Sequence, residues 1–110
     1  MEQVDFSKPP SLYWSLQAKL EHLQRRIIVY SIMYYKMGCS CVSDAFYDGV
    51  SRQLVAMAQS NPDVYKRTRY YYAMDDFDGS TGFDIPNRLH SKDKQMLETL
   101  AAQILQNTKR

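Results

Sequence analysis

Apolar residues recur every three or four positions from Leu16 to Met37, and this spacing predicts a long helix. One stripe follows steps of 4, 3, 4, 3, 4 and 3 residues and consists of Leu16, Leu20, Leu23, Ile27, Tyr30, Tyr34 and Met37. A second set, Ile28, Ile32 and Tyr35, widens the stripe in the last two turns. We therefore expect this end of the helix to be buried on more than one side. The helical pattern starts at Ser11, and Gly38 is a suitable residue to end it.

A second helix is predicted after a short link. Ser43 is a candidate N-cap, and Asp44 lies in the first turn, where the helix dipole favours a negative charge. The apolar stripe then continues at steps of 3, 4 and 3 through Tyr47, Val50, Leu54 and Met57. Pro62 disfavours helical backbone in the residue before it and ends this helix. The two helices should therefore pack as an antiparallel αα-hairpin.

The rest of the chain divides into a connector and a last helix. No sustained period is present from Val64 to His90, and the aromatic run 70–74 is expected to form a short strand or extended segment. Ser91 opens a helix whose apolar face holds Leu97, Leu100, Ala101, Ile104 and Leu105. We predict one mainly α domain over residues 1–110. It comprises a helical hairpin over 11–60, an irregular connector over 61–90 and a C-terminal helix over 91–110.

Composition narrows the functional classes. With 110 residues and 12.9 kDa, the chain is long enough for one domain with a modest core. A net charge of +2 gives little drive toward nucleic acid, and no apolar run is long enough to span a membrane. Residues 1–10 lack the apolar region of a signal peptide. We therefore expect a protein of the cytoplasm that binds neither nucleic acid nor membranes.

No metal is predicted. A zinc site would need Cys39 and Cys41 to be joined by His22 and His90, and these four residues have no zinc-site spacing. The segment Asp76–Gly79 resembles the middle of a calcium loop, but apolar residues stand at the first and last ligand positions of that loop. Two reduced thiols and an ordinary turn are the simpler interpretations.

One group of residues at the tip of the hairpin carries chemistry. Asp44, Tyr47 and Asp48 have the i, i+3, i+4 spacing that places them on one helix face. The hairpin should bring this face near Tyr34 and Tyr35. Aromatic faces attract a flat cationic ring, and carboxylates accept hydrogen bonds from ribose hydroxyls and amide N–H groups. The predicted ligand is therefore a cationic aromatic ring on a ribose, such as nicotinamide mononucleotide (NMN).

The pattern Tyr-Tyr followed nine residues later by Ser-Asp-Ala-x-Tyr-Asp resembles the N-terminal NMN-recognition subdomain of bacterial NAD-dependent DNA ligases. The resemblance covers about residues 16–63 and implies a helical piece that grips the NMN half of NAD. By position it implies that Tyr34 and Tyr47 stack on the nicotinamide and that Asp44 and Asp48 accept hydrogen bonds. Tyr35 stands where the family has His, which keeps an aromatic ring but loses a cationic partner for the phosphate.

The chain lacks the Lys-x-Asp-Gly motif that supplies the ligase nucleophile, so the resemblance implies neither adenylation nor ligation. The whole chain looks more like short stand-alone phage-encoded proteins related to that subdomain. In them a Tyr-Tyr-x-x-x-Asp-Phe-Asp-Gly-Ser-Thr-Gly-Phe-Asp tail replaces the rest of the ligase, and Tyr71 to Leu89 fit that description. The favoured hypothesis is a non-catalytic accessory protein that binds NMN or NAD in the cytoplasm of an infected or lysogenic bacterial host.

Three alternatives stay open. Each hairpin residue has a structural explanation of its own, since Tyr34 continues the apolar stripe and Asp48 can pair with Arg52. The second alternative is a small phage effector that inhibits a host or defence complex, as anti-CRISPR proteins do, through a Tyr-rich surface. Its candidate partner surface is formed by Lys66, Arg67, Arg69, Tyr70, Tyr71 and Tyr72. The third is an enzyme that cleaves a nicotinamide nucleotide, for which no nucleophile–base pair is evident.

Overall fold

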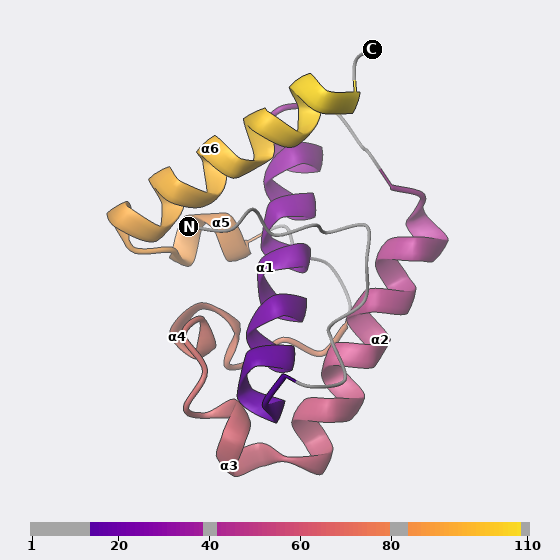
Figure 1. The fold of residues 1–110 in the computed structure, drawn as a ribbon, viewed down its shortest axis with the longest axis vertical. Helices are drawn as coiled ribbons and strands as arrows, with labels where there is room; N and C mark the ends of the chain where they lie inside the picture. The colour runs from indigo at the N-terminus through magenta and orange to yellow at the C-terminus, as the bar shows by residue number, and fades with distance from the viewer. Residues whose placement is uncertain (1–13, 39–41, 80–83, 109–110) are drawn as a thin grey trace.

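The computed structural model describes residues 14–38, 42–79 and 84–108, and for residues 107 and 108 it describes only the backbone. The predicted helix start at Ser11 and both cysteines lie outside the described residues. Six helices make up the described chain, which contains no strand, and the predicted mainly α fold is confirmed (Figure 1). None of these helices combines the length and the apolar character needed to cross a membrane.

The first two helices form the predicted hairpin. Helix α1 covers Leu16–Tyr35 and begins at Ser15, whose hydroxyl accepts a hydrogen bond of 3.1 Å from the amide of Ala18. Gly38 follows α1 with a φ of +67°, a backbone conformation that glycine adopts without strain. Helix α2 covers Asp44–Ser60 and starts at the predicted cap, because the Ser43 hydroxyl accepts from the Phe46 amide at 3.1 Å.

Helix α1 is the centre of the fold. It contacts α2, α3, α5 and α6, and α6 (Ser91–Thr108) crosses it at the upper end in Figure 1. Every residue from Arg26 to Met33 is buried, which confirms that the second half of this helix is enclosed on more than one side. The buried apolar residues of α1 are Leu20, Leu23, Ile27, Ile28, Val29, Tyr30, Ile32 and Met33. Burial of such side chains is the main force that holds the fold together.

The connector consists of three four-residue helices, α3 (Pro62–Tyr65), α4 (Tyr71–Met74) and α5 (Ile85–Arg88). The predicted strand or extended segment over 70–74 is therefore wrong. The carbonyl of Tyr70 accepts hydrogen bonds from the amides of Ala73 and Met74, at 3.0 and 3.1 Å, which closes a helical turn. An aromatic run predicts a strand only on average, and here the burial of Tyr70 and Ala73 decides the conformation.

Two side-chain networks join the connector to the long helices. At α1, the Gln24 amide donates to the Thr68 hydroxyl at 2.8 Å, and that hydroxyl donates to the Tyr65 carbonyl at 2.6 Å. At α6, the carboxylate of Asp93 accepts from the Tyr72 hydroxyl at 2.6 Å and from the Arg69 guanidinium at 2.8 Å. We call this second set the Asp93 network.

Candidate functional site

The hairpin tip presents two tyrosine rings to solvent. Tyr34 and Tyr35, in the last turn of α1, are 55% and 40% exposed, so the burial predicted for the stripe ends before them. Their ring centroids lie 4.8 Å apart with the planes at 81°, an edge-to-face arrangement. Because Tyr34 is more than half exposed, its alternative role as a core residue is wrong. Both rings are available for contact with a ligand.

Tyr47 lies between this ring pair and the interior. Its hydroxyl is 3.3 Å from the Ser31 hydroxyl, so the tip of the side chain points to α1 while the residue stays partly exposed. Burial raises the pKa of Tyr47, and the nearby Tyr35 and Asp48 raise it further, against a hydrogen bond from Ser31 that lowers it. Tyr47 therefore joins the start of α2 to α1 through Ser31.

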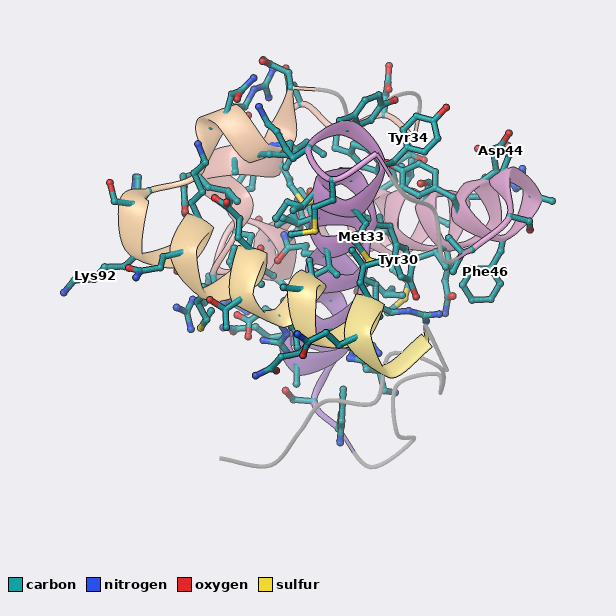
Figure 2. The ribbon with its side chains drawn as sticks, turned by 90° about the horizontal axis from the view of Figure 1, so that it is seen from above. Tyr30, Met33, Tyr34, Asp44, Phe46 and Lys92 are labelled. Carbon is teal, nitrogen blue, oxygen red and sulfur yellow. The ribbon has the colours of Figure 1, made fainter. Side chains whose placement is uncertain are left out.

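The two carboxylates stand on the exposed side of α2. Asp44 and Asp48 are one helical turn apart, and both are exposed. Figure 2 shows Tyr34 and Asp44 on the same side of the molecule, whereas Phe46 lies on the opposite side of α2. Exposed aromatic rings can stack on a flat cation, and exposed carboxylates can accept hydrogen bonds from its substituents.

Phe46 belongs to a second aromatic group that the sequence did not predict. Its half-exposed ring lies 6.3 Å from Tyr30 and under the guanidinium of Arg26, whose central carbon is 5.4 Å from the ring centroid. Arg26 is buried although it lies off the predicted apolar stripe. No signal in the sequence distinguishes Arg26 from its neighbour Arg25, which is less buried.

The candidate partner surface of the connector divides into two parts. Tyr70 is wholly buried, Tyr72 donates to Asp93 and stacks on His90 at 3.9 Å, and Arg69 pairs with Asp93. Tyr72 and Arg69 thus join the connector to α6, whereas Tyr70 is part of the core. Lys66, Arg67 and Arg69 keep exposed side chains, and Tyr71 and Tyr72 are partly exposed. Of the six predicted residues, only Tyr70 is buried.

Comparisons with protein-family models, with curated proteins and with solved structures found no match to this chain.

Proposed function

We propose that this chain is a non-catalytic accessory protein that binds a nicotinamide nucleotide, NMN or NAD, at the tip of the α1–α2 hairpin. The observations that support the proposal are the exposed edge-to-face pair Tyr34 and Tyr35 at the end of α1 and the exposed carboxylates of Asp44 and Asp48 at the start of α2. A nicotinamide ring is flat and cationic, so it gains both stacking and cation–π attraction from such a pair.

The carboxylates add selectivity. The carboxamide and ribose hydroxyls of NMN are hydrogen-bond donors, and Asp44 and Asp48 are acceptors when ionised. A nicotinic acid analogue places a carboxylate where NMN has an amide, and it would be repelled. The reduced dihydronicotinamide ring has no positive charge and would lose the cation–π attraction. We therefore expect NMN and NAD to bind more tightly than nicotinic acid mononucleotide and NADH.

Calorimetric titration tests the proposal. Heat should be measured for NMN and NAD with the wild-type chain, with Tyr34→Ala, with Asp48→Ala and with Met96→Ala. Met96 is a large exposed side chain on α6 that is not one of the proposed nucleotide-binding residues, and it serves as the control. We expect weaker binding in the first two variants and wild-type affinity in the third. Absence of heat for both nucleotides, or equal affinity in all variants, refutes the proposal.

Product analysis separates binding from catalysis. After incubation with NAD, chromatography should recover the nucleotide intact. Release of free nicotinamide would instead identify a hydrolase and refute the non-catalytic part of the proposal.

The second candidate function is a phage effector that binds a host or defence protein. It is favoured by the size of the exposed aromatic side chains Trp14, Tyr34, Tyr35 and Phe46, since aromatic residues are enriched at protein interfaces. Affinity capture from a bacterial lysate distinguishes the two functions when wild type and Asp48→Ala are compared. A partner captured equally by both chains would favour the effector function over nucleotide binding.

A further inference from the structure

A pocket of about 280 Å³ lies at the opposite end of the hairpin from Tyr34. It is bounded by the end of α2, by α3 and by the segment that follows α4, which lie together at the lower end of Figure 1. Three aromatic side chains line it, namely Tyr65, Tyr71 and Phe77, together with one cation, Lys66, and one carboxylate, Asp75. None of these residues belongs to the proposed nucleotide site.

The aromatic rings form a corner. Tyr65 and Tyr71 have centroids 5.6 Å apart and planes at 89°, so their faces meet at a right angle. The Tyr65 hydroxyl donates to the carbonyl of Met74 at 2.6 Å, which fixes the ring in place. Val55, another lining residue, touches the position where Gly79 would carry a Cβ, at 3.4 Å, so the segment after Phe77 is packed against α2. The contacts of Tyr65 with Met74 and of Gly79 with Val55 therefore fix the walls of the pocket in the absence of a ligand.

The charges at this corner have both signs. Burial, together with nearby Tyr71, Asp75 and Asp76, raises the pKa of Tyr65 to about 12, against a hydrogen bond from Gln24 that lowers it. The ring thus experiences a negative field from the side of the carboxylates. Lys66 follows Tyr65 directly and contributes a positive charge at the same pocket. A simple cation would be repelled by Lys66, and a simple anion would be repelled by Asp75.

We propose that this pocket binds a zwitterionic quaternary ammonium compound, a trimethylammonium group joined by a short chain to a carboxylate or phosphate. The methyl groups lie against Tyr65, Tyr71 and Phe77, where the aromatic faces attract the positive charge without any hydrogen-bond donor. Asp75 complements the ammonium, and Lys66 pairs with the anionic end. A quaternary ammonium suits such a site because it has no N–H groups left unsatisfied on leaving water.

The probes are phosphocholine and glycine betaine, titrated into the full chain by calorimetry. The control ligand is 3,3-dimethylbutyl phosphate, in which carbon replaces the ammonium nitrogen and the shape is kept. We expect the control to bind about 3- to 30-fold more weakly than phosphocholine, the range that the cation–π attraction supplies between exposed and desolvated sites. Equal affinity of the two ligands, or no heat from either zwitterion at millimolar concentration, overturns the proposal.

Three variants test the assigned roles. Tyr71→Leu removes an aromatic face and should weaken binding, whereas Tyr71→Phe keeps the face and should preserve it. Lys66→Gln should weaken phosphocholine binding and leave the affinity for choline unchanged or higher. Arg67→Gln, an exposed neighbour that does not line the pocket, is the matched control for charge. Phosphocholine binding that is insensitive to Tyr71→Leu in a chain with wild-type circular dichroism would contradict the assignment.

Two further measurements define the ligand source and the independence of the site. Co-sedimentation with phosphatidylcholine vesicles but not with phosphatidylglycerol vesicles would identify a lipid headgroup as the source. Phosphocholine binding without co-sedimentation would identify a free small molecule. NMN also carries a cationic ring and a phosphate, so its titration into Tyr71→Leu should give wild-type affinity. Loss of NMN binding in this variant would place the nucleotide in this pocket and overturn the assignment to a quaternary ammonium.

Discussion

Replacing Asp93 by alanine should destabilise the fold more than any other single change to an ion pair described here. Asp93 is only 8% exposed, and its carboxylate accepts from the Tyr72 hydroxyl and the Arg69 guanidinium. Hydrogen bonds to a charged group contribute about 1.5–3 kcal/mol each. The Arg69 side chain is 51% exposed, so solvent screening reduces its share to about 0–1 kcal/mol. The expected loss in the free energy of unfolding is therefore about 1.5–4 kcal/mol.

Urea unfolding followed by circular dichroism at pH 7 measures this loss. Asp93→Asn keeps an oxygen that can accept from Tyr72 and should lose less than Asp93→Ala. Asp76→Ala breaks an ion pair with Arg88 whose Asp76 side chain is 66% exposed, and it should shift the urea midpoint by only a small margin because solvent screens the pair. If the urea midpoint of Asp93→Ala differs from that of wild type by no more than this small margin, the Asp93 network does not hold the connector to α6.

The pH dependence gives an independent check. Burial acts to raise the pKa of Asp93, but the hydrogen bonds from Tyr72 and Arg69 outweigh it and hold the pKa below its ordinary value of 3.8. A depressed carboxyl pKa in the folded state contributes stability above the unfolded pKa, and this stability is lost as the pH falls through the folded value. The difference in the free energy of unfolding between wild type and Asp93→Ala should therefore shrink below about pH 4. A difference that stays constant down to pH 2 would contradict the explanation.

Four further changes have expected outcomes that urea unfolding can check. Ser43→Ala removes the cap on the Phe46 amide and should cost about 1 kcal/mol, whereas an unchanged midpoint would mean that α2 needs no cap. Leu54→Ala leaves a cavity in the core and should cost about 2–5 kcal/mol, and a smaller loss would mean that the site collapses. Gly38→Ala meets open space but strains a positive φ, so a cost of about 1 kcal/mol is expected, and no cost would show that the turn rearranges. Burial and the hydrogen bond to the Asp93 carboxylate raise the pKa of Tyr72 to about 12, so the stability from its neutral form is present below pH 10 and lost as the pH rises toward 12. Tyr72→Phe has no group that ionises at this position, so its stability should not fall in this pH range. An equal fall in stability for wild type and Tyr72→Phe would contradict this explanation.

Local signals predicted the long helices well. The hydroxyl of Ser43 and the glycine at position 38 act within one helical turn, so their effects can be recognised from neighbouring residues alone. Ser91 likewise opens α6 as predicted. For α1 the sequence predicted a start at Ser11, which lies outside the described residues, and did not single out Ser15, whose hydroxyl caps the observed helix.

The connector could not be predicted in the same way. Its helices are determined by contacts between residues far apart in the sequence, such as Gln24 with Thr68 and Tyr72 with Asp93. The burial of Tyr70 follows from these contacts and not from its neighbours. At the hairpin tip, the stripe predicted that Tyr34 faces inward, but α1 extends past the elements that cover it, and the ring emerges into solvent.

The three connector helices have four residues each, and helices of that length do not persist alone in water because their nucleation is unfavourable. Their order is therefore a consequence of docking against α1 and α6. The hairpin contacts are close in sequence and can form early in folding, whereas the connector must wait until α6 supplies Asp93. We expect the amide hydrogens of 62–79 and 84–88 to exchange together, in a single opening that undocks α6, so that these helices behave as one cooperative unit.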